Sequence, residues 1–360
     1  MPWDKKRTQA LLAKIGETVP GKIRLMEVCG THTMAIARAG IKTMLPDEIR
    51  LLSGPGCPVC VTPPQAIDAC LELSTQSGVI LASYGDMLRV PGSRAGDSLL
   101  RRRALGARIE TVYSPVDAVE LALKNPERQV VFLGVGFETT APGTAAAVLT
   151  AKEKGAHNFT LWSMLKRVEP ALRALIRMED FAVDGFLCPG HVASILGAEG
   201  FAFLPAEYGL PAVVAGFEPE DILCAVSRLV KQIAEKHPRL ENEYTRAVSQ
   251  KGNRLAQNMM ERCFEPRGDR WRGLGTIADS GLKLRPELED FDAEKRFQIR
   301  YDDAETKTPC RCGEVITGRL RPEDCPLFGK RCTPEDPVGP CMVSSEGACA
   351  AAWKYADMRE

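Results

Sequence analysis

The chain has 360 residues, and 47 lysines and arginines balance 47 aspartates and glutamates. This length predicts two or three domains, each able to bury a core. A hydrophobic fraction of 44% and a charged fraction of 26% exclude a disordered or fibrous chain. Zero net charge gives no support for a nucleic-acid-binding or membrane-binding surface. Since the sequence also shows no signal peptide or membrane span, we expect a cytoplasmic protein.

Short apolar runs alternate with helical patterns between residues 22 and 216. This alternation predicts βαβ units with parallel sheets. Eight buried strands are predicted, at 23–28, 49–53, 79–83, 108–113, 129–134, 159–164, 185–187 and 212–215. Because Asn125-Pro126 interrupts the pattern, we expect two similar α/β domains, residues 22–124 and 125–217, facing a cleft. Residues 218–360, with 1–21, are expected to form a mostly helical or irregular, cysteine-rich domain.

Four polar motifs fall at the turn between a predicted strand and the helix that follows it. In open α/β sheets, ligands bind outside the carboxyl ends of the strands, near helix N-termini. We therefore expect the four motifs to line one cleft. They are CGTHT at 29–33, PGCPVC at 55–60, GFETT at 136–140 and CPGH at 188–191.

The first two motifs carry the thiols of this expected cleft. At a helix start the dipole favours the thiolate of Cys29, and His32 could share that face as a ligand or a hydrogen-bond donor. The same pair could equally be a buried thiol beside a capping histidine. Cys57 and Cys60 form a CxxC motif, which is typical of half a zinc site or of a redox pair. All four residues could also bind zinc together.

The other two motifs offer acid–base groups. Glu138 stands beside Thr139 and Thr140, where it could exchange protons or anchor polar ligands, or simply begin a capped helix. The glycines before it match a dinucleotide fingerprint only in part, and no P-loop lysine follows. His191 could face the cleft or satisfy a loop.

The cysteine-rich tail is the strongest signal for a metal. Six of the 13 cysteines fall within the last 51 residues, and a cytoplasmic pool keeps thiols reduced, so this crowding indicates a metal or cluster. Four of them are separated by 12, 6 and 16 residues, namely Cys312, Cys325, Cys332 and Cys349. Four thiolates suit zinc or a [4Fe–4S] cluster, and the absence of a second CxxC motif favours the cluster.

These motifs resemble those of the HypD family of [NiFe]-hydrogenase maturation proteins. The resemblance is carried by CGTHT, PGCPVC, GFETTAP, PGHV and the C-x12-C-x6-C-x16-C tail, and spans residues 23–349. It implies a scaffold with redox activity, rather than a conventional turnover enzyme, on which an Fe(CN)2CO unit is assembled. It also implies a monomer that forms complexes with the chaperone HypC and with HypE, which donates cyanide from a thiocyanate.

The resemblance further implies roles for single residues. Cys29 would bind the iron, with His32 in or beside its coordination shell, and Cys57 and Cys60 would form a thiol–disulfide pair. Cys312, Cys325, Cys332 and Cys349 would hold a [4Fe–4S] cluster in a third domain. Releasing cyanide from a thiocyanate is reductive, which the thiol pair and the cluster would support. Donors to the cyanide nitrogens are expected among Thr31, His32, Thr139 and His191.

Two alternatives stay open at this point. The first is a thiol–disulfide oxidoreductase that uses Cys57 and Cys60 on protein substrates with an iron–sulfur reductant. The second is a structural zinc-binding module without redox activity. A nucleotide-dependent enzyme is weaker because its fingerprint is incomplete.

Overall fold

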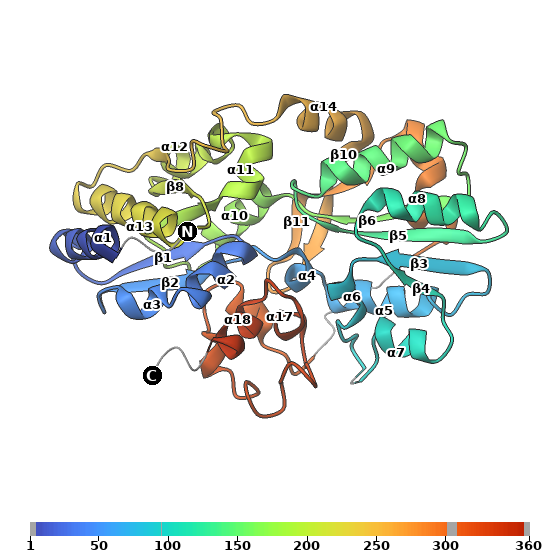
Figure 1. Cartoon of the computed structure of the whole chain (residues 1–360), viewed down its shortest axis with the longest axis horizontal. Helices are drawn as coiled ribbons and strands as arrows, with labels where there is room; N and C mark the ends of the chain where they lie inside the picture. Colours follow the sequence, from blue (N-terminus) through green and yellow to red (C-terminus); the bar gives the residue numbers. More distant parts are fainter. Residues whose placement is uncertain (1–4, 95, 301–307, 356–360) are drawn as a thin grey trace.

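The computed structural model describes residues 5–94, 96–300 and 308–355. Two parallel sheets lie side by side, and a cysteine-rich segment lies below the region between them (Figure 1). The helices are α1 (Lys5–Thr18), α2 (Gly30–Arg38), α3 (Ile41–Met44), α4 (Pro58–Val61), α5 (Pro64–Leu73), α6 (Gly85–Leu88), α7 (Leu99–Ala104), α8 (Pro115–Lys124), α9 (Ala141–Glu153), α10 (Val168–Ile176), α11 (Gly190–Leu196), α12 (Phe203–Tyr208), α13 (Pro219–Ala234), α14 (Arg254–Cys263), α15 (Ala293–Arg296), α16 (Cys312–Val315), α17 (Pro340–Val343) and α18 (Ala348–Lys354).

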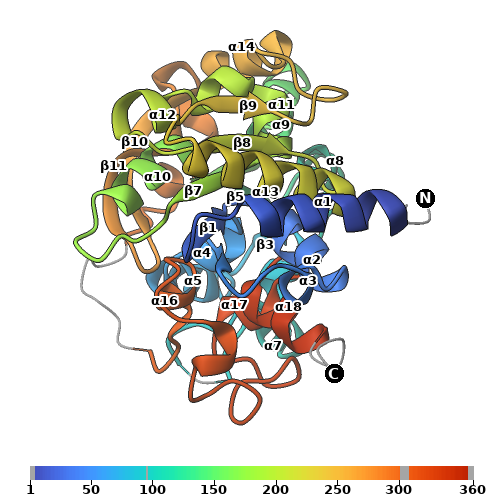
Figure 2. The ribbon, with the colours of Figure 1, turned by 90° about the vertical axis from the view of Figure 1, so that its left-hand side faces the viewer.

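The first sheet has five parallel strands in the order β2-β1-β7-β8-β9. Their bounds are β1 (Ile23–Glu27), β2 (Ile49–Ser53), β7 (Gly185–Pro189), β8 (Ala212–Ala215) and β9 (Leu240–Asn242). Helix α13 packs on β7 and β8 through the apolar positions Ile222, Val226 and Leu229, which are fully buried. Figure 2 shows α1 lying along α13 on the outside of this sheet.

The second sheet has four parallel strands in the order β4-β3-β5-β6. Their bounds are β3 (Val79–Ser83), β4 (Ile109–Thr111), β5 (Gln129–Gly136) and β6 (Phe159–Leu165). Every residue of β3 and β6 is buried, which explains their mostly apolar sequences, since helices or the hairpin described below cover the sheet. Helix α8 begins with a capping box in which Ser114 and Asp117 satisfy each other's backbone N–H groups.

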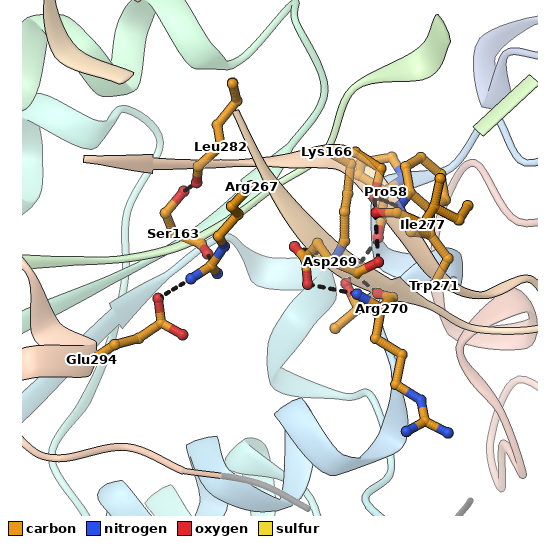
Figure 3. Close-up of polar contacts among 12 residues, drawn as sticks. Pro58, Ser163, Lys166, Arg267, Asp269, Arg270, Trp271, Ile277, Leu282 and Glu294 are labelled. Atoms are coloured by element: carbon orange, nitrogen blue, oxygen red, sulfur yellow. Dashed lines mark hydrogen bonds and ion pairs between the residues drawn. The ribbon is translucent and has the colours of Figure 1, made fainter. Parts of the chain in front are cut away.

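An antiparallel hairpin packs against the second sheet. It consists of β10 (Phe264–Trp271) and β11 (Gly275–Leu284), and Ser163 Oγ of β6 donates to Leu282 O over 2.6 Å. Lys166, just after β6, and Asp269 of β10 form an ion pair with 2.6 Å between Nζ and Oδ2, and both are buried (Figure 3). The hairpin is therefore held to the sheet by backbone and side-chain bonds.

All eight predicted strands are present, but the predicted boundary near residue 125 does not separate the two sheets. Strands β3 and β4 come before that point, yet they pair with β5, while β7 returns to lie beside β1. The tail also departs from the expectation of one mostly helical domain after residue 217. Its α13 and β9 belong to the first sheet, and its hairpin covers the second. No helix in the described part of the chain is long and apolar enough to span a membrane.

Candidate functional site

Cys29 lies where β1, an inner strand of the first sheet, passes into a helix. Strand β1 ends at Glu27, and Cys29, in extended conformation, is the residue before α2. Its backbone N–H donates to Glu27 Oε2 over 3.0 Å, and Thr33 Oγ1 donates to Glu27 Oε1 over 2.5 Å. The buried Glu27 carboxyl thus fixes the turn that presents the cysteine.

The CxxC loop packs directly against this turn. Gly56 O accepts from Gly30 N over 3.0 Å, and a Cβ on Gly56 would lie 2.2 Å from the Cys29 nitrogen, so only glycine fits there. Cys57 and Cys60 follow and form a disulfide across the first turn of α4, with their Cα atoms 5.2 Å apart. The structure therefore brings the first two motifs together, as expected from their place at neighbouring strands.

A loop of the cysteine-rich segment covers both thiol motifs. Ser344 Oγ lies 3.4 Å from Cys57 Sγ, and Thr31 Oγ1 donates to Glu346 Oε1 over 2.7 Å. Asp86 Oδ2, at the start of α6, holds the loop by accepting from Ser345 N over 2.9 Å. Three distant parts of the chain thus meet at the cysteines.

An aromatic stack joins His32 to His191. The Phe217 ring lies between them, with its centroid 4.7 Å from the His32 ring and 3.9 Å from the His191 ring. His32 Nε2 donates to Gly216 O over 2.9 Å, so Nδ1 carries a lone pair, which is buried and has no hydrogen-bond partner among the described residues. His191 is exposed at the start of α11.

Burial has a larger effect than neighbouring charges on the pKa values of the ionisable groups at this site. It raises the pKa of Cys29 to about 12, and the hydrogen bonds at the helix start only partly oppose this shift. The thiolate of Cys29 that the helix dipole was expected to favour is therefore disfavoured, because desolvation outweighs the dipole. Burial also lowers the pKa of His32 to about 4 and raises that of Glu27 to about 7. At neutral pH the thiol and the imidazole are uncharged.

The GFETT motif follows a strand of the other sheet and makes different contacts. Glu138 is buried, Val168 N donates to its Oε1 over 2.9 Å, and burial raises its pKa to about 7. Its Oε2 has no hydrogen-bond partner in the described chain. Thr140 precedes α9 without capping it through its side chain, and Thr139 is exposed. None of the hydrogen bonds or ion pairs seen among the described residues joins these three to Cys29.

All six tail cysteines line one small cavity within the cysteine-rich segment. Cys310 and Cys341 lie there beside the four expected ligands, Cys312, Cys325, Cys332 and Cys349. Within the described ranges, no three histidine, cysteine or acidic side chains already converge on a single ion. Cysteine thiolates are soft donors of the kind that hold zinc or an iron–sulfur cluster.

Several residues at the site were missed from the sequence. Glu27 lies inside a predicted strand, and Asp86, Ser344 and Glu346 belong to segments without a recognised motif. Only Glu27 had a recognisable sequence signal, because it is a carboxylate at the end of a strand predicted to be buried.

Comparison with known proteins shows the family of this chain. The family model HypD, described as "Hydrogenase formation hypA family", matches residues 6–356. The hydrogenase maturation factor HypD of Escherichia coli (strain K12) is 45% identical over 339 residues, which cover 94% of this chain and 90% of that protein. Those of Rhodobacter capsulatus and Azotobacter vinelandii are both 44% identical and cover 97% and 99% of this chain, and 93% and 96% of their own length. The chain belongs to the HypD family of hydrogenase maturation factors.

Proposed function

We propose that this maturation factor is the scaffold on which the Fe(CN)2CO unit of a [NiFe] hydrogenase is assembled, with Cys29 as the iron ligand. The observation that carries the proposal is the packing around Cys29. A buried thiol, a disulfide loop and a loop of the cysteine-rich segment meet at one strand end. Soft thiolate ligation suits low-spin iron with cyanide and carbonyl ligands.

Loading the iron changes the ionisation of Cys29. A thiol with a pKa near 12 is protonated at neutral pH, so binding iron must displace its proton. Glu27, whose pKa lies near 7 and whose carboxyl binds the Cys29 backbone, can exchange protons under those conditions. His32 Nδ1 offers a lone pair, so His32 acts as a ligand or proton acceptor and not as a donor to cyanide.

Cys57 and Cys60 supply two electrons in this proposal. In their dithiol form they reduce the thiocyanate of a HypE-type donor: the S–C bond breaks, the carrier sulfur keeps one proton, and cyanide leaves with the other. The dithiol loses two electrons and two protons and becomes the disulfide that the structure contains. Cys57 and Cys60 are buried, at 5% and 1% exposed, which favours a small reacting group over a folded protein substrate.

The cysteine-rich segment fits a [4Fe–4S] cluster through its soft donors. We assign Cys312, Cys325, Cys332 and Cys349 as ligands because they line one cavity and carry the family spacing. When bound, the cluster would supply single electrons at low potential. Exposed His191 and the covering Ser344–Glu346 loop lie where a HypC-type chaperone and the cyanide donor would approach a cytoplasmic monomer.

The test is infrared spectroscopy of the complex with the chaperone, purified without oxygen. We expect Cys29→Ala to keep its fold and its cluster but to lose the cyanide and carbonyl bands. Cys224→Ala removes a half-buried thiol of α13 outside the site and should keep them. Bands that survive in Cys29→Ala would refute the role of Cys29.

A further inference from the structure

The turn between β10 and β11 connects the disulfide loop to the cysteine-rich segment. Its Arg272 backbone N–H donates to Val61 O over 2.8 Å, and Arg272 Nε donates to Thr62 O over 3.0 Å. Helix α4 has only four residues, so its last carbonyls lack partners within the helix. Arg272 therefore supplies hydrogen bonds to the carbonyl groups at the C-terminal end of α4, the helix that carries Cys60.

The other side of the turn rests on the cysteine-rich segment. A Cβ on Gly273 would lie 2.6 Å from the Cα of Gly313, the residue after Cys312. Gly273 has a φ of +79°, so glycine is required there for backbone conformation as well as for space. Arg272 and Cys310 line the same cavity of about 640 Å³. One turn thus touches both sulfur-bearing parts of the molecule.

The guanidinium of Arg272 has a further nitrogen that is not used in the bond to Thr62. Its terminal NH2 group is buried and has no hydrogen-bond partner in the part of the chain that the structure describes. A buried donor without a partner is costly, more so when it is charged. An anionic group in the adjacent cysteine-rich segment would satisfy both the hydrogen bond and the charge.

The base of the turn is rigid, which fixes the position of the arginine. Trp271 Nε1 donates to Ser280 Oγ over 2.9 Å, and its ring stacks on Phe137 with centroids 5.9 Å apart. Lys166 forms its buried ion pair with Asp269 and donates to Arg270 O over 2.9 Å. Figure 3 labels Lys166, Asp269, Arg270 and Trp271 of this cluster, and also Pro58, the first residue of α4.

We propose that Arg272 is a positioning residue that locks the disulfide loop to the cysteine-rich segment and stabilises negative charge on its sulfur centre. The inference rests on the proposed function, because it takes that centre to be the cluster. Reduction adds negative charge to a cluster, so a fixed cation beside it favours the reduced form and raises the midpoint potential. Removing the cation lowers the potential.

The experiment is a reductive titration of the purified protein with dithionite, followed by its visible spectrum. We expect Arg272→Gln to shift the equilibrium about tenfold toward the oxidised cluster, or about 59 mV to lower potential for one electron. Arg272→Lys keeps the charge and should shift it far less. Arg319→Gln removes a cation from the same cavity whose guanidinium contacts Asp180 and Thr317, and should leave the potential near that of the wild type.

Two results would overturn the inference. These are an unchanged potential in Arg272→Gln, or equal shifts in Arg272→Gln and Arg319→Gln. If the glutamine variant does not fold, Arg272→Met keeps the aliphatic packing and takes its place. A wild-type protein without iron and sulfide would refute the cluster, and this role of Arg272 with it, whereas a cluster insensitive to Arg272 would refute the arginine's role alone.

Discussion

Glu27 makes the folding stability of this protein depend on pH. Its carboxyl is 2% exposed, and its pKa rises from an ordinary 4.5 to about 7 because burial disfavours the charged form. The folded state therefore binds this proton more tightly than the unfolded chain. The resulting stabilisation is fully present below pH 4.5 and is lost as the pH rises through 7. A shift of this size corresponds to about 3 kcal/mol, of which about 2 to 3 kcal/mol falls between pH 5 and pH 8.

The substitution Glu27→Gln isolates this effect, because glutamine does not titrate and keeps one acceptor oxygen. At pH 5 we expect the variant to be less stable by about 1 to 2 kcal/mol, since one of the bonds from Cys29 N and Thr33 Oγ1 is lost. At pH 8 that deficit should disappear or reverse. Anaerobic urea unfolding at both pH values measures the change, and Glu110→Gln, at an exposed position of β4, is the control. An equal difference at pH 5 and pH 8 would refute the reasoning.

Two further predictions concern the buried ion pair and the cysteine-rich segment. Asp269→Asn leaves Lys166 buried without its counter-ion and should lower the free energy of unfolding by about 3 to 5 kcal/mol. The double variant Lys166→Met with Asp269→Leu should recover most of that loss. Urea unfolding measures both variants, and an equal loss of stability in the two would contradict the argument. Cys325→Ser should abolish the iron and sulfide content, whereas Cys341→Ser should retain it. If Cys310→Ser loses the cluster and Cys312→Ser keeps it, the first ligand is Cys310.

The local fold was predictable from the sequence to a large extent. Strands β3, β5 and β8 consist mostly of apolar residues, and CGTHT and PGCPVC lie at strand-to-helix turns, as expected. Both signals are local, because each depends on residues close together in the chain. The pairing of β1 with β7 is not local, and alternation of strands and helices holds no information about which sheet a strand joins.

The candidate site shows the same division. Cys29 and the disulfide loop were predictable because their motifs sit at neighbouring strands, whereas Asp86 and Glu346 reach the site only through tertiary packing. The ionisation of Cys29 was misjudged for a related reason. Sequence places it at a helix start, but only the folded structure reveals that it is buried. The contacts of Arg272 likewise depend on which part of the chain the turn between β10 and β11 packs against.

The strand order also constrains how the chain folds during synthesis. The second sheet is built from consecutive strands, so it can form as soon as β6 leaves the ribosome. The first sheet cannot, because β1 can pair early only with β2, and its other partner, β7, follows about 160 residues later, as the bond from Arg24 N to Asp184 Oδ2 illustrates. At usual rates of translation this wait lasts roughly 10 to 30 seconds. During that interval the second edge of β1, next to the turn that carries Cys29, stays unpaired, and an unpaired strand edge is a site at which a nascent chain can aggregate.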